Sequence, residues 1–162
     1  MAESMEDVSD PAVGIIMGSA SDMPVIQKAE VILERFGVSF ETRVLSAHRM
    51  PDQATEYAKY AVDRGLKVII AGAGRAAHLA GAMAANTTLP VIGVPVFTEQ
   101  LGGADALYST VQMPPGVPVA TVGLDGSVNA AVLAVQILAT SDLDLAAKLR
   151  EFKQELAQGL RF

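Results

Sequence analysis

The sequence contains no cysteine, and only two of its 162 residues are histidines. A chain without cysteine has no thiolate nucleophile, no sulfur ligand for a zinc ion and no disulfide framework. Metal ligands are therefore limited to histidine, aspartate and glutamate. The lack of thiols is also compatible with a reducing compartment, and we expect the protein in the cytoplasm.

Clusters of basic residues are missing as well, and the net charge is −6. Residues 1–11 contain no lysine or arginine but hold four acidic residues, Glu3, Glu6, Asp7 and Asp10. The rest of the chain carries a net charge of only −2. Phosphate neutralisation requires clustered basic side chains, so we expect no nucleic-acid partner. We predict that residues 1–11 form a disordered acidic leader outside a single domain over 12–162.

Long apolar runs are absent. No segment approaches the roughly 18 consecutive apolar residues that cross a bilayer, and the acidic start differs from the basic and then apolar start of a signal peptide. We therefore expect no membrane partner. What the chain does have is 51% hydrophobic residues. At this length one core can bury roughly 70% of the unfolded chain's surface without disulfides or structural metals.

From Val13 onward, short runs rich in valine and isoleucine alternate with longer segments of helical periodicity. We predict strands over 13–17, 40–44, 68–71, 91–94 and 117–122. We predict helices over 25–36, 51–64, 77–86, 104–108, 129–139 and 142–160. The alternation indicates an α/β protein, a three-layer α/β/α sandwich with a five-stranded parallel sheet and an extra C-terminal helix.

The last segment, 142–160, is amphipathic. Its apolar stripe consists of Leu145, Leu149, Phe152, Leu156 and Leu160. Because the other helices already cover the sheet, this stripe needs another surface, either the flank of its own domain or a neighbouring subunit. We favour a subunit interface.

In a doubly wound sheet, ligands bind beyond the carboxyl ends of the strands, so the loops that follow strands hold the candidate residues. The first loop, 17–22, reads Met-Gly-Ser-Ala-Ser-Asp. The hydroxyls of Ser19 and Ser21, with free N–H groups at the start of a helix, predict an anion site. An equally good interpretation is that Ser21 or Asp22 only caps the helix.

The second loop reads Ser-Ala-His-Arg-Met-Pro at 46–51. The imidazole of His48 can give and take a proton near neutral pH. Arg49 can form paired hydrogen bonds with a phosphate or a carboxylate. On this loop alone, a solvated or capping histidine remains the alternative to a catalytic one.

The third loop, 71–79, contains Gly-x-Gly-x-x-Ala, a pattern related to dinucleotide-binding loops. No acidic residue occurs between Arg75 and Glu99 to hold a ribose, so we do not expect a dinucleotide. The glycines instead favour close approach of a small ligand to the backbone. His48 and His78 lack a third ligand at a recognisable spacing, so no metal is expected. The fourth loop, 95–103, is a lid, a wall of the site or an ordinary turn.

Five stretches together resemble the PurE family of purine biosynthesis, and the likeness runs from about Val13 to Leu149. They are Met-Gly-Ser-x-Ser-Asp at 17–22, Ser-Ala-His-Arg-x-Pro at 46–51, Gly-Ala-Gly-x-Ala-Ala-His-Leu at 72–79, Val-Gln-Met-Pro at 111–114 and Asn-Ala-Ala at 129–131. The resemblance implies a flavodoxin-like fold, no cofactor, and a homo-octamer whose C-terminal helices reach across subunits.

The resemblance also implies an aminoimidazole ribonucleotide as substrate. In the class I branch, an isomerase moves a carboxylate from N5 of N5-carboxyaminoimidazole ribonucleotide to the ring carbon C4. His48 matches the general acid/base, and Ser19, Asp22 and Arg49 match substrate-binding positions. The remaining residues implied to line the substrate pocket are Ser21, Ser46, Ala47, Gly74, Ala76, Ala77, His78 and Leu79.

Arg75 leaves the branch of the family open. Class I members usually carry Gly-Gly where this chain has Gly74-Arg75, and Gly-Arg is similar to class II, which carboxylates the aminoimidazole ribonucleotide directly with CO2. The stretches 76–79 and 49–51 are similar to class I, so we favour the mutase and expect Arg75 to point away from the CO2 pocket. A third hypothesis is a nucleotide-binding domain without catalysis, but such a domain has no need of His48 beside Arg49.

Overall fold

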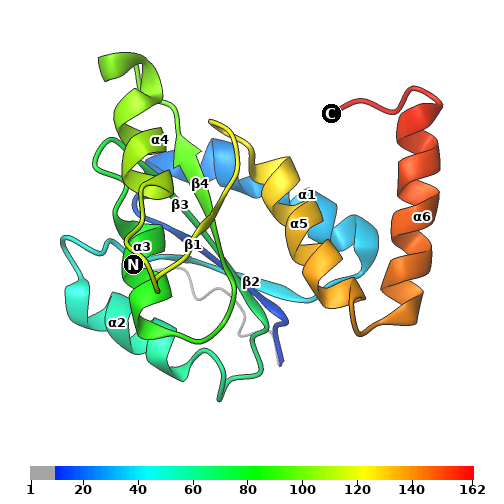
Figure 1. Cartoon of the computed structure of the whole chain (residues 1–162), viewed down its shortest axis with the longest axis horizontal. Coiled ribbons are helices and arrows are strands. Elements are labelled where there is room, and N and C mark those ends of the chain that lie inside the picture. The colour runs from blue at the N-terminus through cyan, green and yellow to red at the C-terminus, as the bar shows by residue number, and fades with distance from the viewer. Residues whose placement is uncertain (1–9) are drawn as a thin grey trace.

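A computed structural model describes residues 10–162. Residues 1–9, most of the predicted acidic leader, lie outside the described residues. The described chain forms one sheet of five parallel strands in the order β2-β1-β3-β4-β5 (Figure 1). The strands are β1 (Val13–Met17), β2 (Phe40–Val44), β3 (Val68–Gly74), β4 (Val91–Val96) and β5 (Ala120–Thr121). The α/β class and the five-stranded parallel sheet are confirmed, and this strand order is the flavodoxin-like one.

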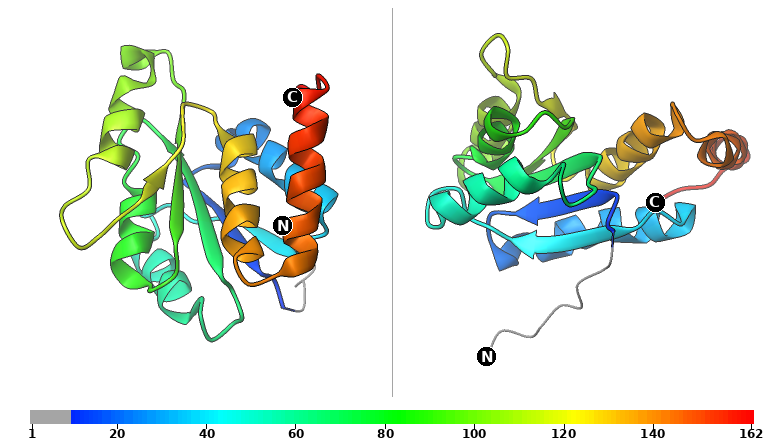
Figure 2. Two further views of the ribbon diagram at one scale, coloured as in Figure 1. Left: turned by 45° about the vertical axis from the view of Figure 1, so that its right-hand side comes forward. Right: turned by 90° about the horizontal axis from the view of Figure 1, so that it is seen from below.

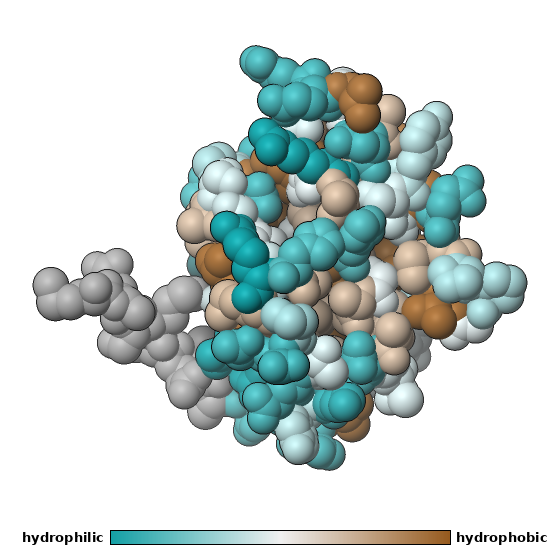
Figure 3. Space-filling model, turned by 90° about the vertical axis from the view of Figure 1, so that its left-hand side faces the viewer, coloured by the Kyte–Doolittle hydropathy of each residue, from teal (hydrophilic) through white to brown (hydrophobic). Residues whose placement is uncertain are grey.

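The described residues also form six α-helices: α1 (Met23–Phe36), α2 (Pro51–Tyr60), α3 (Leu79–Asn86), α4 (Ala104–Val111), α5 (Ser127–Ala139) and α6 (Leu143–Ala157). Two short 3-10 turns, η1 (Ala20–Asp22) and η2 (Gln100–Gly103), precede α1 and α4. Helices α1 and α5 cover one face of the sheet, and α2, α3 and α4 cover the other (Figure 2). The surface over α2, α3 and α4 is mainly hydrophilic, with hydrophobic residues scattered across it (Figure 3).

Side chains of β1 divide between two cores, as the period of two in a strand requires. All five residues of β1 are buried. Ile15 belongs to the core with α1 and α5, whereas its neighbour Ile16 belongs to the core with α2 and α3. The continuous apolar run at 13–17 therefore reflects coverage of both faces.

Most predicted boundaries differ from the observed ones. Strands β3 and β4 and helix α4 end two or three residues later than predicted, α1 and α5 begin two residues earlier, and α6 covers 143–157 instead of 142–160. Three further differences have a local cause. Helix α2 ends at Tyr60 rather than at 64, and hydrogen-bonded turns carry the chain on to Gly65, whose φ is +88°. Strand β5 is limited to 120–121 instead of 117–122, because Val117 closes a turn with Pro114 and Pro118 has no N–H for the ladder. Helix α3 begins at Leu79, two residues after the predicted start, since residues 75–78 form turns.

Helix α6 packs on its own chain beside α1 and α5 (Figure 1). Phe152 is 3% exposed and makes an edge-to-face contact with Phe36, with ring centroids 5.4 Å apart. Lys148 Nζ donates to the carbonyl of Phe36 at 2.8 Å. Leu145, Leu149, Leu156 and Leu160 are only half-buried against the same core, so the stripe is covered in part within a single chain. A role of α6 at a subunit interface stays a prediction. Among the described residues, no helix is long and apolar enough to cross a membrane.

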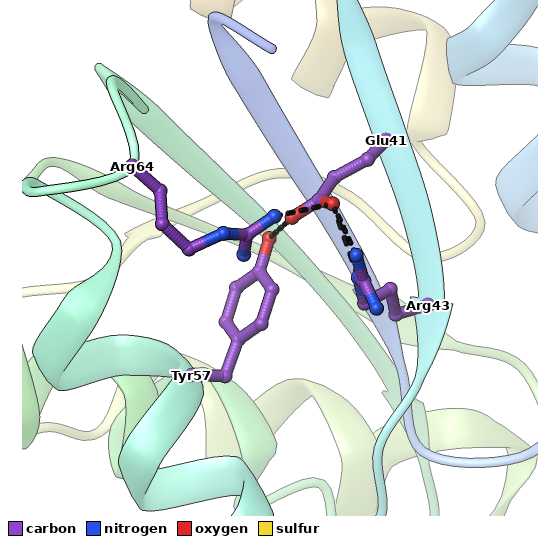
Figure 4. Close-up of polar contacts among 4 residues, drawn as sticks. All are labelled: Glu41, Arg43, Tyr57 and Arg64. Atoms are coloured by element: carbon purple, nitrogen blue, oxygen red, sulfur yellow. Dashed lines mark hydrogen bonds and ion pairs between the residues drawn. The ribbon is translucent and has the colours of Figure 1, made fainter. Parts of the chain in front are cut away.

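Strand β2 and helix α2 are joined by four side chains, here called the Glu41 cluster: Glu41, Arg43, Tyr57 and Arg64 (Figure 4). Glu41 is 8% exposed. Its carboxylate accepts hydrogen bonds from Tyr57 Oη at 2.7 Å and from Arg64 Nη2 at 2.6 Å. Arg43, on the same strand, lies with Nη2 2.9 Å from Glu41 Oε2. These contacts fix β2 against α2, and the loop between the two elements carries His48.

Candidate active site

A cavity of about 610 Å³ opens at the carboxyl ends of β1, β2 and β3. Strands β1 and β3 are neighbours in the sheet, but the helices that follow them cover opposite faces. Such a switch point leaves a crevice between the diverging loops. The cavity is lined by Gly18, Ser19, Ser21, Asp22, Ser46, Ala47, His48, Arg49, Ala73, Gly74, Arg75, Ala76, Leu79 and Thr98. The first three predicted loops therefore meet in one place.

In the first loop, Ser19 caps the 3-10 turn η1 that precedes α1. Its backbone is extended, with φ −151°, and its Oγ accepts from Ser21 N at 3.3 Å and from the Ser21 hydroxyl at 2.8 Å. Asp22 occupies the N-cap position of α1 but makes no side-chain capping bond. The interpretation that Ser21 or Asp22 caps the helix is therefore wrong, and the carboxylate of Asp22 is available to a ligand.

Burial raises the pKa of Asp22 above its ordinary value, and hydrogen bonds with Ser21 and Ser19 offset this only in part. The Ser21 hydroxyl lies 3.4 Å from Asp22 Oδ1, so it satisfies the carboxylate weakly. A ribose hydroxyl that donated to Asp22 would provide the hydrogen bond that the chain itself does not.

The second loop is tied to the first through Arg49. Ser46 is buried, and its Oγ accepts from Arg49 N at 3.2 Å. Arg49 Nη2 donates to the carbonyl of Gly18 at 3.3 Å. One edge of the guanidinium is thus anchored beside Ser19, and its remaining N–H groups lie in the cavity wall where a phosphate can accept from them.

His48 and His78 form a hydrogen-bonded pair. His48 Nε2 lies 2.9 Å from His78 Nδ1, and the two rings are nearly perpendicular, at 86°. In such a pair one nitrogen donates its proton and the other accepts the hydrogen bond, so the tautomers of the two rings depend on each other. His78 is not part of the cavity wall, and neither is Ala77, which is buried. Every other predicted substrate-binding residue lines the cavity.

Thr98 and Arg75 also line the cavity, although neither was predicted as a site residue. Thr98, which follows β4, was not singled out, although the fourth loop was one candidate wall. A Cβ built on Gly74 would lie 3.1 Å from Thr98 Cγ2, so Gly74 permits this close approach. Arg75 is exposed and is one of the residues at the cavity wall, with φ +56°. That its side chain points away from the CO2 pocket, toward solvent or a neighbouring subunit, stays a prediction.

Within residues 10–162, no group of three or more His, Asp or Glu side chains is placed to hold a metal ion. The titratable groups of the cavity wall are instead those of Asp22, His48, Arg49 and Arg75. The arrangement suits an anionic small molecule and a proton transfer.

A sheet in this order with a small-molecule cavity at its switch point defines a flavodoxin-like α/β protein with a ligand-binding site. The family model described as AIR carboxylase matches residues 12–159, and the chain belongs to this family.

Relatives are similar over nearly the whole chain. The chain is 53% identical over 152 residues to the N5-carboxyaminoimidazole ribonucleotide mutase of Pyrococcus abyssi, covering 94% of this chain and 87% of the relative. It is 57% identical over 150 residues to the Bacillus subtilis protein of the same name, covering 91% and 93%. The crystal structure of Treponema denticola PurE matches with a TM-score of 0.83 and 33% identity, covering 91% of this chain and 92% of that one.

Proposed function

We propose that this protein is a cytoplasmic N5-carboxyaminoimidazole ribonucleotide mutase of purine biosynthesis, which moves the carboxylate of its substrate from N5 to C4. The observation that carries the proposal is that His48, which is hydrogen-bonded to His78, lines the same cavity as Ser19, Ser21 and Asp22 of the first loop. The names of the relatives support it.

The substrate's remote groups bind at one end of the cavity. Its phosphate accepts hydrogen bonds from the N–H groups of Arg49 and from the hydroxyls of Ser19 and Ser21. A ribose hydroxyl donates a hydrogen bond to the carboxylate of Asp22. These contacts do not change during the reaction. They hold the base in place while the reacting atoms remain weakly bound.

His48 is the general acid and base. It protonates N5, the bond between N5 and the carboxylate carbon breaks, and carbon dioxide is released inside the cavity. C4 attacks the carbon dioxide, a new carbon–carbon bond forms, and His48 takes the proton that C4 loses. The proton given to N5 is thereby recovered, and the net change is an isomerisation.

Carbon dioxide offers few contacts, so the cavity retains it by shape and by exclusion of water. Ala47, Ala73 and Ala76 provide small apolar walls. Ala77 was expected among these walls, but it is buried and is not among the residues that line the cavity.

Direct carboxylation of aminoimidazole ribonucleotide is the second candidate, and the position of Arg75 in the wall favours it. The two reactions are separated by supplying each substrate alone at neutral pH. We expect rapid conversion of the N5-carboxylated ribonucleotide to the C4-carboxylated product. Conversion of the uncarboxylated ribonucleotide with dissolved CO2, without conversion of the N5-carboxylated one, would establish the carboxylase instead. If neither substrate is converted, the result would support the third hypothesis, a nucleotide-binding domain without catalysis.

The proposal includes a homo-octamer. Because the apolar stripe of α6 is only partly covered within its own chain, deletion of residues 143–162 separates two possibilities. Loss of the octamer in light scattering would place α6 at a subunit contact, whereas a folded octamer without α6 would assign the helix to its own domain.

A further inference from the structure

Ser109, on α4, links that helix to the third loop. Its Oγ accepts a hydrogen bond from Ala77 N at 3.0 Å. The nearest acceptor for the hydroxyl proton is the carbonyl of Asp105, at 2.6 Å. Because a hydroxyl donates one proton and accepts through its lone pairs, both bonds form at once. The side chain therefore fastens residue 77 to a helix 32 residues further along the chain.

The turn over 75–78 has little to hold it from within. Arg75 has φ +56°, a left-handed conformation that L residues rarely adopt. The turn's own backbone bonds span only two residues, from Ala77 N to Arg75 O and from His78 N to Ala76 O. Such short turns have poor hydrogen-bond geometry, so an anchor from outside contributes much to their position.

The anchor acts next to the imidazole pair. His78 follows Ala77 directly and occupies the N-cap position of α3 without capping it. Its ring instead lies with Nδ1 2.9 Å from His48 Nε2. A shift of the backbone at Ala77 would move His78, and a displacement of about 0.5 Å lengthens a hydrogen bond of this kind beyond its favourable range.

We propose that Ser109 is a positioning residue of the reaction: by holding Ala77 N, its hydroxyl keeps the His78 ring in hydrogen-bond contact with His48 and so couples the tautomer of His48 to that of His78. The inference rests on the proposed function for the role of His48. Ser109 is not among the residues that line the cavity. Its other contact with the third loop is a weak one, with the backbone carbonyl of Arg75 at 3.4 Å, in the same turn. Its effect is transmitted through His78.

The chain provides a matched control at the next position. Thr110 donates to the carbonyl of Ala106 at 2.7 Å, a bond within α4 of the same i to i−4 kind as that from Ser109 to Asp105. Thr110 faces the sheet at Gly93 rather than the turn. Thr110→Val removes a hydroxyl from α4 without touching the third loop, whereas Ser109→Ala removes the anchor and Ser109→Thr retains it.

The experiment measures turnover and imidazole nitrogen spectra of the untagged protein at mildly alkaline pH. With only two histidines, four ring nitrogens report the tautomers without overlap from other rings. In Ser109→Ala we expect kcat to fall about tenfold, the equivalent of one hydrogen bond. We expect KM to stay within about twofold and the fixed tautomers to average, and Ser109→Thr and Thr110→Val should keep the spectrum and kcat of the starting protein.

An unchanged imidazole spectrum in Ser109→Ala would overturn the proposal, whatever the activity. Altered tautomers with unchanged turnover would overturn the proposal too. That result would also argue against His48 as the catalyst, and His48→Asn tests the role of His48 separately. If Ser109→Ala does not fold, Ser109→Cys keeps the volume with a much weaker acceptor, and the same spectral change is expected.

Discussion

Glu41 and Asp22 are two carboxylates with opposite surroundings. Burial alone would raise the pKa of Glu41, but hydrogen bonds from Arg64, Tyr57 and Arg43 outweigh it, and the pKa lies below its ordinary value. Burial raises the pKa of Asp22, and its two serine contacts do not restore it. The carboxylate of Glu41 receives enough hydrogen bonds from the protein to offset its burial, and the carboxylate of Asp22 does not. The comparison indicates that Glu41 stabilises the fold and that Asp22 is kept for a ligand.

The largest expected effect is on turnover, from a substitution in the cavity that also contains Asp22. His48→Asn removes the only acid/base group proposed for the cavity, so we expect turnover to fall roughly 10² to 10⁴-fold. His48 is exposed, so the free energy of unfolding should change little. Steady-state kinetics and thermal melting check the two parts. A variant with more than a third of the original activity would show that His48 is not the catalyst.

Glu41→Ala tests whether the Glu41 cluster stabilises the fold. It leaves two arginines and the Tyr57 hydroxyl without their shared acceptor. Because the arginines are 43% and 35% exposed, we expect the lower end of the range for breaking a buried ion pair, about 3 kcal/mol of unfolding free energy. Urea denaturation measures the loss.

Activity per folded molecule should stay within about twofold in Glu41→Ala, since Glu41 lies outside the cavity. Glu41→Gln is the control, because an amide of similar shape keeps an acceptor for Tyr57 and Arg64. A large fall in kcat with unchanged stability would reverse the assignment of the Glu41 cluster.

The two carboxylates also differ in what the sequence could predict. The loop of Asp22 was identified because a strand, a small-residue turn and a helix follow one another locally. The Glu41 cluster was not, because the sequence of the strand at 40–44 does not show which side chains will pair with Glu41 and Arg43. Their burial depends on Tyr57 and Arg64, which come from α2 and the turn after it. Local pattern carries no information about such partners.

The same limit explains other differences. Strands β1 and β2 were predicted with their observed bounds. The end of α2, the contact of Thr98 with Gly74 and the bond of Ser109 to Ala77 all depend on elements distant in sequence. The apolar stripe of α6 was visible in the sequence, but the surface it meets was not.

Asp22→Asn should affect binding more than folding. A carboxylate that accepts from a ribose hydroxyl contributes a charge-assisted bond, so we expect affinity for the C4-carboxylated ribonucleotide to fall about tenfold. Ionised Asp22 is unfavourable in the folded protein because its pKa is raised, so the variant should be at least as stable at neutral pH. Calorimetric titration and urea denaturation measure both quantities. Unchanged affinity with lower stability would return Asp22 to a structural role.

The smallest expected effect is on the pH dependence of stability. The folded pKa of Glu41 is lowered, so its contribution is present above its unfolded pKa, near 4.5, and is lost as the pH falls through the folded value. Asp22 has the opposite sign: its folded pKa is raised, so protonation near and below its folded pKa relieves an unfavourable charge. Urea midpoints measured from neutral to acidic pH should therefore fall less steeply in Glu41→Gln than in the unsubstituted protein, and more steeply in Asp22→Asn. Parallel curves for all three proteins would show that the two carboxylates do not differ in the way their surroundings indicate.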